Sequence, residues 1–153
     1  MLTLNLKIPP LVIMAFVAAL MWLGAQAVPA EDFPLPARKI IALGLAAVGV
    51  GVAVAGVVSF RVAKTTVNPL KPDTASSLVV AGIYRVTRNP MYLGMLIVLI
   101  GWAALLANAL AFIAAATFVL YLNRFQIIPE EQALTTRFGP EFAAYCAQVR
   151  RWI

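Results

Sequence analysis

The stretch that decides the fold is NPMYLGMLIVLIGWAALLANALAFIAAATFVLYLN, which covers residues 89–123 and carries no charged side chain. It is too long for one membrane crossing, because a spanning helix takes about 20 apolar residues. Its only strongly polar side chain between residues 91 and 122 is Asn108. We therefore expect a tight helical hairpin that bends there. Each arm would have about 16 residues, or roughly 24 Å; thinning of the bilayer or incomplete spanning would accommodate arms that short.

The composition of the whole chain indicates a membrane protein. Of its 153 residues, 63% are hydrophobic and only 12% are charged, which is more apolar than a soluble domain of this length can bury. Two further uncharged stretches, residues 8–30 and 40–60, each suit one crossing. We predict an all-α integral membrane protein with about four transmembrane helices, the last two forming the hairpin. Residues 1–60 would hold the two N-terminal transmembrane helices, and residues 61–153 a separate core.

The first helix has an alternative interpretation. Lys7, the apolar run after it and the sequence Ala25-Gln26-Ala27 resemble a signal peptide with a cleavage site. One positive charge is a weak n-region, however, and the run exceeds a usual h-region. We expect a retained first helix; cleavage would leave three.

Basic residues predict the orientation, because cytoplasmic loops carry an excess of Lys and Arg. Lys7 indicates a cytoplasmic N-terminus, and the loop 29–39, with two acids and two basic residues, should face outward. The other basic residues on which this prediction rests are Arg61, Lys64, Lys71, Arg85, Arg88, Arg124, Arg137, Arg150 and Arg151. We expect both termini to be cytoplasmic, in an inner or plasma membrane, where anionic headgroups would attract the net charge of +6. Nucleic acid binding is not expected.

Missing residue types exclude several kinds of chemistry. The chain has no histidine, which excludes Ser-His-Asp and Cys-His catalysis, His-ligated haem and the common zinc sites, so we expect no metal site. Cys146 is the only cysteine and is expected to be a packing residue. No phosphate-binding glycine loop occurs. The predicted spans also lack the buried acid or base on which proton-coupled carriers depend. Charge chemistry is therefore expected at the cytoplasmic rim.

Small residues predict how the second helix packs. Ala47, Gly51 and Ala55 recur at four-residue spacing, with Gly44, Gly49 and Gly56 nearby. Such a face lets helix backbones approach closely in lipid. We expect this helix to be a packing element.

Three short segments surround the hairpin. The connector 61–77 contains two turn signals, at residues 68–69 and 71–73, and the apolar piece 78–84 is too short to span, so it could lie at the interface or re-enter shallowly. After Pro129 we expect two short helices, 130–138 and 141–151, divided at Gly139-Pro140. The second is amphipathic and is expected to lie on the cytoplasmic membrane face.

A polar motif, YRVTRNPMYLG at residues 84–94, stands at the mouth of the hairpin. Asn89 before Pro90 is a strong helix-start signal, in which the asparagine side chain caps free N–H groups. The positive end of the helix, with Arg85 and Arg88 beside it, would suit a carboxylate or phosphate. The plainer alternative is that the arginines and tyrosines are interfacial anchors and Asn-Pro is just a cap.

The paired acids Glu130-Glu131 come after the second arm. If the hairpin forms, both cytoplasmic ends meet, and two acids and two arginines share one interfacial site. The plainer alternative is that the acids complement the N-terminal dipole of the helix after Pro129.

These motifs together resemble a known superfamily. The sequence runs Gly82-x-Tyr84-x3-Arg88-Asn89-Pro90-Met91-Tyr92-Leu93-Gly94, an apolar hairpin, Glu130-Glu131, then Leu134, Phe138-Gly139, Phe142 and Tyr145. Over about residues 76–153 this order resembles the isoprenylcysteine carboxyl methyltransferase and phospholipid methyltransferase superfamily of integral membrane enzymes. The resemblance implies that residues 61–153 are a methyltransferase-like catalytic core and that the cofactor is S-adenosylmethionine.

Site residues are implied by the resemblance position by position. It implies that the cofactor is held by Ser76, Ser77, Leu78, Val79, Tyr84, Arg88, Asn89, Pro90, Met91, Tyr92 and Glu130. The implied catalytic residues are Glu130, Glu131 and Arg124. Two positions depart from the family: its usual histidine is Asn89 here, and an arginine four residues before the first acid, found in the enzymes that methylate isoprenylcysteine, is Gln126. Arg124 is close in sequence to that position but falls on another helix face.

Methyl transfer agrees with what these residues can supply. The reaction is an in-line displacement in which positioning alone can contribute several kcal/mol, so no histidine is needed. A carboxylate or thiolate acceptor attacks without a strong base, whereas an amine must be unprotonated, with Glu130 or Glu131 accepting the proton. We therefore expect a membrane-embedded methyltransferase that acts on a lipophilic or small acceptor. Its soluble cofactor would enter from the cytoplasm, and a lipophilic acceptor would enter laterally from the bilayer.

Two other functions are compatible with the sequence. A reductase of the sterol reductase type resembles this C-terminal arrangement, but it uses NADPH, whose 2′-phosphate needs cationic partners, and is generally larger. A non-catalytic membrane scaffold would bind neither cofactor. The sequence leaves the oligomeric state and the acceptor open.

Overall fold

The structure is a computed structural model that describes residues 5–28, 34–64 and 76–153. These residues form helices and contain no β-strand. The predicted turns at residues 68–69 and 71–73, and the centre of the predicted outward loop, lie outside the described residues. The elements are α1 (Pro10–Ala27), α2 (Leu35–Val62), the 3-10 helix η2 (Gly82–Arg85), α3 (Pro90–Leu106), α4 (Ala109–Leu122), the π-helix η3 (Asn123–Ile127), α5 (Ile128–Phe138) and α6 (Pro140–Gln148).

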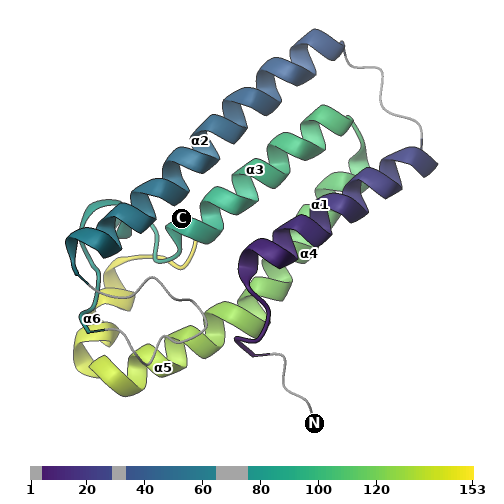
Figure 1. The fold of residues 1–153 in the computed structure, drawn as a ribbon. Coiled ribbons are helices and arrows are strands. Elements are labelled where there is room, and N and C mark those ends of the chain that lie inside the picture. The colour runs from purple at the N-terminus through teal and green to yellow at the C-terminus, as the bar shows by residue number, and fades with distance from the viewer. Residues whose placement is uncertain (1–4, 29–33, 65–75) are drawn as a thin grey trace.

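The long helices α1, α2, α3 and α4 lie side by side, with α3 between α2 and the pair formed by α1 and α4 (Figure 1). Helix α3 runs antiparallel to α2, and α4 runs antiparallel to α3. The ends of α2 and α4 therefore lie near the start of α3. The same end of the bundle holds α5 and α6 (Figure 1). This arrangement confirms the expected hairpin.

The turn of the hairpin is built from Ala107 and Asn108. Ala107 has φ +46°, a left-handed conformation that lets the chain reverse in two residues. The buried Asn108 side chain accepts a hydrogen bond from the Leu110 amide at 2.9 Å and so caps α4. Its Nδ2 donates to the Val28 carbonyl at the end of α1, 3.2 Å away. One polar side chain thus ties three helix ends together.

The sequence indicated that the helix now labelled α4 stops before Pro129, but in the structure it continues. It passes through η3 into α5, which gives one continuous helix of 30 residues, Ala109–Phe138. Proline has no N–H for the carbonyl four residues earlier, which belongs to Phe125. That carbonyl accepts the Leu6 amide instead, at 3.0 Å, and the π-helix widens the turn where the proline enters. The predicted helix 130–138 is confirmed as α5, but it follows α4 without a break, because the N-terminal segment supplies an amide for the Phe125 carbonyl.

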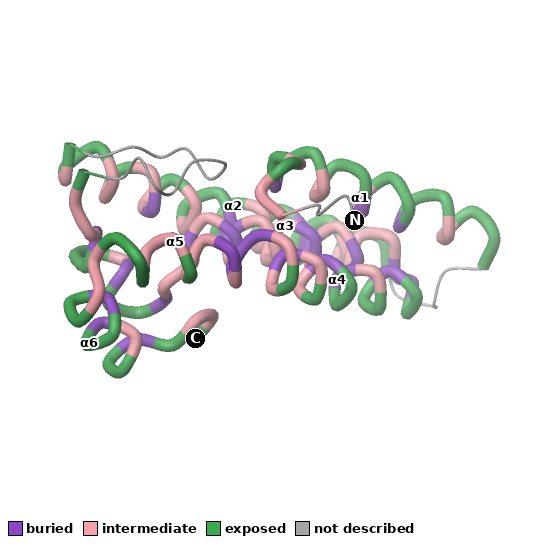
Figure 2. Tube along the Cα trace, turned by 90° about the horizontal axis from the view of Figure 1, so that it is seen from below, coloured by how far each residue is buried: buried purple, intermediate pink, exposed green. Residues whose placement is uncertain are grey.

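Within the described residues, three helices are long and apolar enough to cross a membrane: α1, α2 and the 30-residue helix that begins with α4. Helix α3 is as apolar but has 17 residues. Three of the four expected crossings thus have helices of sufficient length, and a crossing by α3 stays a prediction. Figure 2 shows exposed residues along the outer sides of α1 and α4, where large apolar side chains such as Leu11 and Ile113 are found. In water such a surface would be costly, whereas lipid accommodates it.

The packing face of α2 differs from the predicted one. Ala47 and Gly51 are exposed, whereas Ala42, Gly49 and Gly56 are buried. These three recur every seven residues, close to two helical turns, so they form a narrow seam against α3. The prediction of a small-residue packing helix was right, but the face was wrong.

The seam brings two helix backbones into close contact. A Cβ added to Gly49 would lie 2.6 Å from the Gly94 carbonyl oxygen of α3. Farther along, Gly101 of α3 faces Ala42. Glycine is required here by space, because the atoms nearest to an added Cβ include backbone atoms of the facing helix.

The C-terminal helices are divided at Gly139, as predicted. Gly139 has φ +50° and Pro140 begins α6. Helix α6 ends at Gln148 rather than at 151, because Val149 is extended. Its apolar residues Phe142 and Tyr145 are buried against protein, not presented to lipid.

Apart from the apolar core between the long helices, a second apolar cluster covers that face of α6. It contains Val79, Tyr84, Phe142, Tyr145 and Val149. The apolar piece 78–84 thus packs under α6 and against the end of α2, where the ring of Phe60 meets that of Tyr84 edge-on. The apolar side chains of α6 therefore have a protein partner that the sequence alone does not reveal, and the location of α6 at the cytoplasmic membrane face stays a prediction.

We predict that Gly49→Ala destabilises the protein and Gly51→Ala does not. The added methyl group of Gly49→Ala must push α2 and α3 apart, with an expected cost of about 1–3 kcal/mol. Gly51 has nothing within 4 Å, so alanine there should be neutral or stabilising by up to about 1 kcal/mol. Thermal unfolding in detergent measures the difference. Equal unfolding midpoints for the two variants would contradict close packing of α2 against α3 at Gly49.

Candidate functional site

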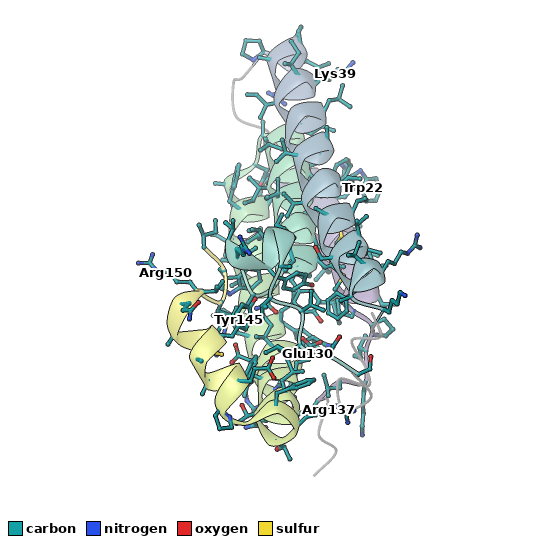
Figure 3. All side chains as sticks on the ribbon, turned by 90° about the vertical axis from the view of Figure 1, so that its left-hand side faces the viewer. Trp22, Lys39, Glu130, Arg137, Tyr145 and Arg150 are labelled. Carbon is teal, nitrogen blue, oxygen red and sulfur yellow. The ribbon has the colours of Figure 1, made fainter. Side chains whose placement is uncertain are left out.

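The hairpin brings the motif at the start of α3 to the paired acids. The Tyr92 hydroxyl on α3 donates a hydrogen bond of 2.5 Å to Glu130 Oε1 on α5. Figure 3 shows Glu130 and Tyr145 at the end of the molecule that also carries Arg137 and Arg150, with Lys39 at the other end. The predicted meeting of the two motifs is therefore confirmed.

Glu130 is surrounded by neutral donors. Besides Tyr92, the Gln126 amide donates to the same Oε1 at 2.8 Å. Gln126 is buried within η3, four residues before Glu130, so the widened turn carries both side chains inward. The half-buried carboxylate is thus held in place without a described cationic partner of its own.

Glu131 is the acid that pairs with arginines. Arg151 binds it in a bidentate manner, with Nη2–Oε2 at 2.6 Å and Nε–Oε1 at 3.1 Å. Arg88 adds a longer contact, Nη2–Oε1 at 3.3 Å. The hydrogen bonds to Glu131 raise the pKa of Arg151 above its ordinary value, so this group stays charged.

The two arginines in the cluster are not the two that were expected. Arg85, at the end of η2, is exposed. Arg151 takes its place from the other end of the core, because the chain after α6 turns back toward α3. The prediction of two acids and two arginines was right in number but wrong in one member.

Residues 149–153 follow α6 without regular secondary structure and are here called the C-terminal strap. The Arg88 amide donates to the Arg150 carbonyl at 3.0 Å, and Asn89 Nδ2 donates to the Arg151 carbonyl at 2.9 Å. At the far end, the Trp152 indole donates to Asn123 Oδ1 at 3.1 Å. The strap therefore joins the start of α3 to the end of α4 (Figure 1).

Asn89 stands at the N-cap position of α3 and Pro90 begins the helix, as predicted. The asparagine side chain makes no cap hydrogen bond, however. It is used on the strap, and its own amide donates to Thr87 Oγ1 at 3.1 Å. The predicted capping role was wrong, and the first free amides of α3 are left without that side-chain acceptor.

Arg88 has hydrogen-bonding capacity left over. Its Nη1 donates to Cys146 Sγ, and its Nη2 contacts Glu131. Its Nε is buried and has no partner among the described residues. A buried donor without an acceptor costs about 1–3 kcal/mol, so an added acceptor would be stabilising here.

The residues expected to line the cofactor before Gly82 lie at the same end of the molecule. The hydroxyls of Ser76 and Ser77 contact the Lys64 and Ala63 carbonyls at 3.4 and 3.3 Å. Leu78 and Val79 belong to the second apolar cluster together with Tyr84. These contacts connect the segment to the end of α2.

Tyr84 lies close enough to Glu130 to interact with it electrostatically. Burial raises the pKa of its phenol far above the ordinary value, and the charges of Tyr145 and Glu130 act in the same direction. The phenol is therefore neutral at physiological pH. Tyr145 donates to the Tyr84 carbonyl at 2.8 Å, which fixes the segment under α6.

Three other predicted residues have contacts of their own. Pro90 and Met91 pack against Gly56 of α2. Arg124 is exposed and its guanidinium lies over the Phe125 ring, 5.4 Å from the centroid. The structure thus brings Arg88, Asn89, Tyr92, Glu130 and Glu131 together but does not bring Arg124 to them.

A pocket of about 470 Å³ opens beside the ion pair of Glu131 and Arg151. Its remaining lining residues, Ile128, Gln132, Thr135 and Thr136, lie along one face of α5. The pocket is an open groove rather than an enclosed cavity. The ion pair therefore forms a wall that a ligand can reach.

Sequence reasoning missed Arg151, Thr87 and Cys146 as members of this site, and treated Gln126 only as a departure from the family. The neighbours of Arg151 are an acid 20 residues away and a helix start more than 60 residues away. No local pattern predicts such a path. Gln126 could have been found, because it lies four residues before Glu130 on a helix and so shares a face with it.

The chain is similar to known proteins over much of its length. A family model described as phospholipid methyltransferase matches residues 37–141. An uncharacterized protein of Haemophilus influenzae (strain ATCC 51907 / DSM 11121 / KW20 / Rd) is 43% identical over 63 residues, which are 41% of this chain and 100% of that protein. No solved structure matches. The family match and the apolar helices together indicate an integral membrane protein with methyltransferase activity.

We predict that Tyr92→Phe lowers the free energy of unfolding by about 1–3 kcal/mol, because it removes a donor from the half-buried Glu130 carboxylate. Tyr121→Phe is the matched control. The Tyr121 hydroxyl is buried with no partner among the described residues, so its removal should be neutral or slightly stabilising. Denaturation in detergent compares the two. An equal loss in both variants would mean that the bond to Glu130 contributes nothing specific.

Proposed function

The chain belongs to the phospholipid methyltransferase family, in the isoprenylcysteine and phospholipid methyltransferase group, and from that membership we propose that it is a membrane-embedded, S-adenosylmethionine-dependent methyltransferase. The acceptor we propose is lipophilic or small and presents an amine, a thiol or a carboxylate. The observation that carries the proposal is the hydrogen bond from Tyr92 to Glu130, which closes the hairpin around one polar site. That bond joins the two motifs on which the family resemblance depends.

The described residues fit the chemical groups of the cofactor. Its amino-acid end carries a carboxylate and an ammonium, which call for a cation and an acid. Arg88 offers a buried Nε without a described partner, and Glu130 offers a carboxylate bound by neutral donors. The free amides at the start of α3 add to the attraction for a negative group. Both requirements are met within one cluster.

Two groups of residues would hold the cofactor on opposite sides. Arg88, Asn89, Pro90, Met91 and Tyr92 would hold the amino-acid end or the sugar. The segment formed by Ser76, Ser77, Leu78 and Val79, together with Tyr84, would line the other side. Glu130 would contact the cofactor or acceptor across the hairpin.

The bound cofactor would supply an electrophilic methyl group on a sulfonium. With an amine acceptor, Glu130 would receive the proton. Both described hydrogen bonds to it fall on Oε1, which leaves Oε2 for that purpose. Glu131 is already paired with two arginines, so its role would be to hold them. Arg124 is exposed over Phe125, and we assign it no catalytic role.

Orientation is part of the proposal. The site end of the chain carries Arg61, Lys64 and Arg137, among other basic residues, and Lys7 lies near it through the contact of Leu6 with Phe125. Excess Lys and Arg favours the cytoplasmic side. We propose that this end and both termini face the cytoplasm of an inner or plasma membrane. Soluble cofactor would then reach the site from the cytoplasm, and a lipophilic acceptor would reach it from the bilayer.

Titration with S-adenosylhomocysteine in detergent tests the cofactor. We expect the wild type to bind, and Asn89→Ala and Glu130→Ala to bind about tenfold more weakly, equivalent to about 1.4 kcal/mol. NADPH serves as the second titrant. Binding of NADPH alone would indicate a reductase, and binding of neither would indicate a scaffold. Wild-type affinity in both variants would mean that the site is misplaced.

We predict that Glu130→Gln lowers the rate of labelled-methyl transfer to an amine acceptor by about 100-fold or more at saturating cofactor, because general-base catalysis contributes about 10²–10⁴. Membrane extracts supply the acceptors. Glu141→Gln is the control, since Glu141 is an exposed acid on α6 outside the cluster and should leave the rate unchanged. Equal rates for both variants would remove Glu130 from the chemistry.

A further inference from the structure

We propose that Arg151 is a positioning residue for the cofactor: it holds Glu131 so that Arg88 stays available to the cofactor carboxylate. The inference rests on the proposed function and goes beyond it, because it assigns a role to the C-terminal strap. Arg151 does not touch the cofactor in this arrangement. It acts through Glu131.

The geometry divides Glu131 unequally between the two arginines. Arg151 makes two hydrogen bonds, at 2.6 and 3.1 Å, one to each carboxylate oxygen. Arg88 makes one contact, at 3.3 Å. Bidentate, charge-assisted pairs are the stronger kind. Glu131 is therefore held mainly by Arg151, and the contact with Arg88 is the one that a ligand can displace.

The remaining contacts of Arg88 leave it prepared for an anion. One is with the Cys146 sulfur, and the Nε is buried without a described acceptor. A guanidinium presents its donors in a planar fork that matches a carboxylate. If Glu131 held Arg88 as tightly as it holds Arg151, this fork would be occupied. The division of Glu131 between two arginines prevents that.

The strap does not depend on the Arg151 side chain. Its backbone carbonyls accept from the Arg88 amide and from Asn89, and Trp152 is bonded to Asn123. These contacts should survive replacement of the Arg151 side chain by alanine, because none of them uses the Arg151 guanidinium. Replacement of that side chain should therefore act on Glu131 and leave the path of the strap unchanged.

The expected consequence of Arg151→Ala is a change in charge balance. Glu131 would keep Arg88 as its only described cation, and Arg88 would turn fully toward it. The cofactor carboxylate would then have to break that ion pair before binding. Neutralising Glu131 as well should release Arg88 again. A purely structural role for Arg151 does not predict this recovery.

The experiment is a titration of detergent-solubilised full-length protein with S-adenosylhomocysteine. Arg151→Ala should weaken binding about tenfold, equivalent to about 1.4 kcal/mol. Adding Glu131→Gln to Arg151→Ala should bring the affinity back to within about threefold of wild type, a residual of less than about 0.7 kcal/mol. Arg151→Lys should be intermediate, because lysine cannot form the fork. Unfolding midpoints show that each variant is folded.

Arg150→Ala is the matched control on the same strap. Arg150 is exposed and lies away from Glu130 (Figure 3), and its backbone carbonyl stays in place to accept the Arg88 amide. We expect wild-type affinity. Equal weakening in Arg150→Ala and Arg151→Ala would indicate a general charge effect and would overturn the inference.

The remaining outcomes separate this inference from the proposed function. Wild-type protein that does not bind S-adenosylhomocysteine would overturn both. Wild-type binding with an unchanged Arg151→Ala would overturn the inference alone. So would a double variant as weak as Arg151→Ala, since Glu131 would then contact the cofactor directly or the strap would act structurally.

Discussion

The rest of the structure depends on the reversal of the chain at Asn108. A buried amide in an apolar bundle must have its hydrogen bonds satisfied, and Asn108 meets that requirement with the Leu110 amide and the Val28 carbonyl. Those two bonds start α4 and fix the end of α1 beside it. Because the turn takes only two residues, α4 returns along α3. The start of α3 and the acids beyond α4 then arrive at one end of the bundle.

The π-helix gives the returning helix its inward side chains. Pro129 would ordinarily end or kink α4, but Leu6 occupies the carbonyl that the proline cannot serve. The helix continues, and the extra residue in its widened turn rotates the side chains of α5 about the helix axis. Gln126 and Glu130 consequently face Tyr92. A backbone amide near the N-terminus thus helps to aim a polar pair near the other end of the chain.

Electrostatics separates the two adjacent acids. Glu130 has neutral donors, whereas Glu131 is shared between Arg88 and Arg151. The same dipeptide therefore supplies a carboxylate suited to accept a proton and another suited to organise cations. The strap makes this separation possible, because it carries Arg151 to the cluster while its backbone binds Asn89. Its position is stabilised by hydrogen bonds with Arg88, Asn89 and Asn123, all far from it in the chain.

The sequence by itself determined the helical hairpin, the start of α3 at Asn89-Pro90 and the break at Gly139-Pro140, because each is set by chain length in lipid or by the backbone limits of Pro and Gly. Only the tertiary structure decided which small residues of α2 face α3, since two stripes at helical spacing were equally available. It also decided that Arg151 rather than Arg85 joins the acids, and that Asn89 binds the strap rather than capping its helix. These choices depend on contacts between segments far apart in the chain, and local periodicity carries no information about them.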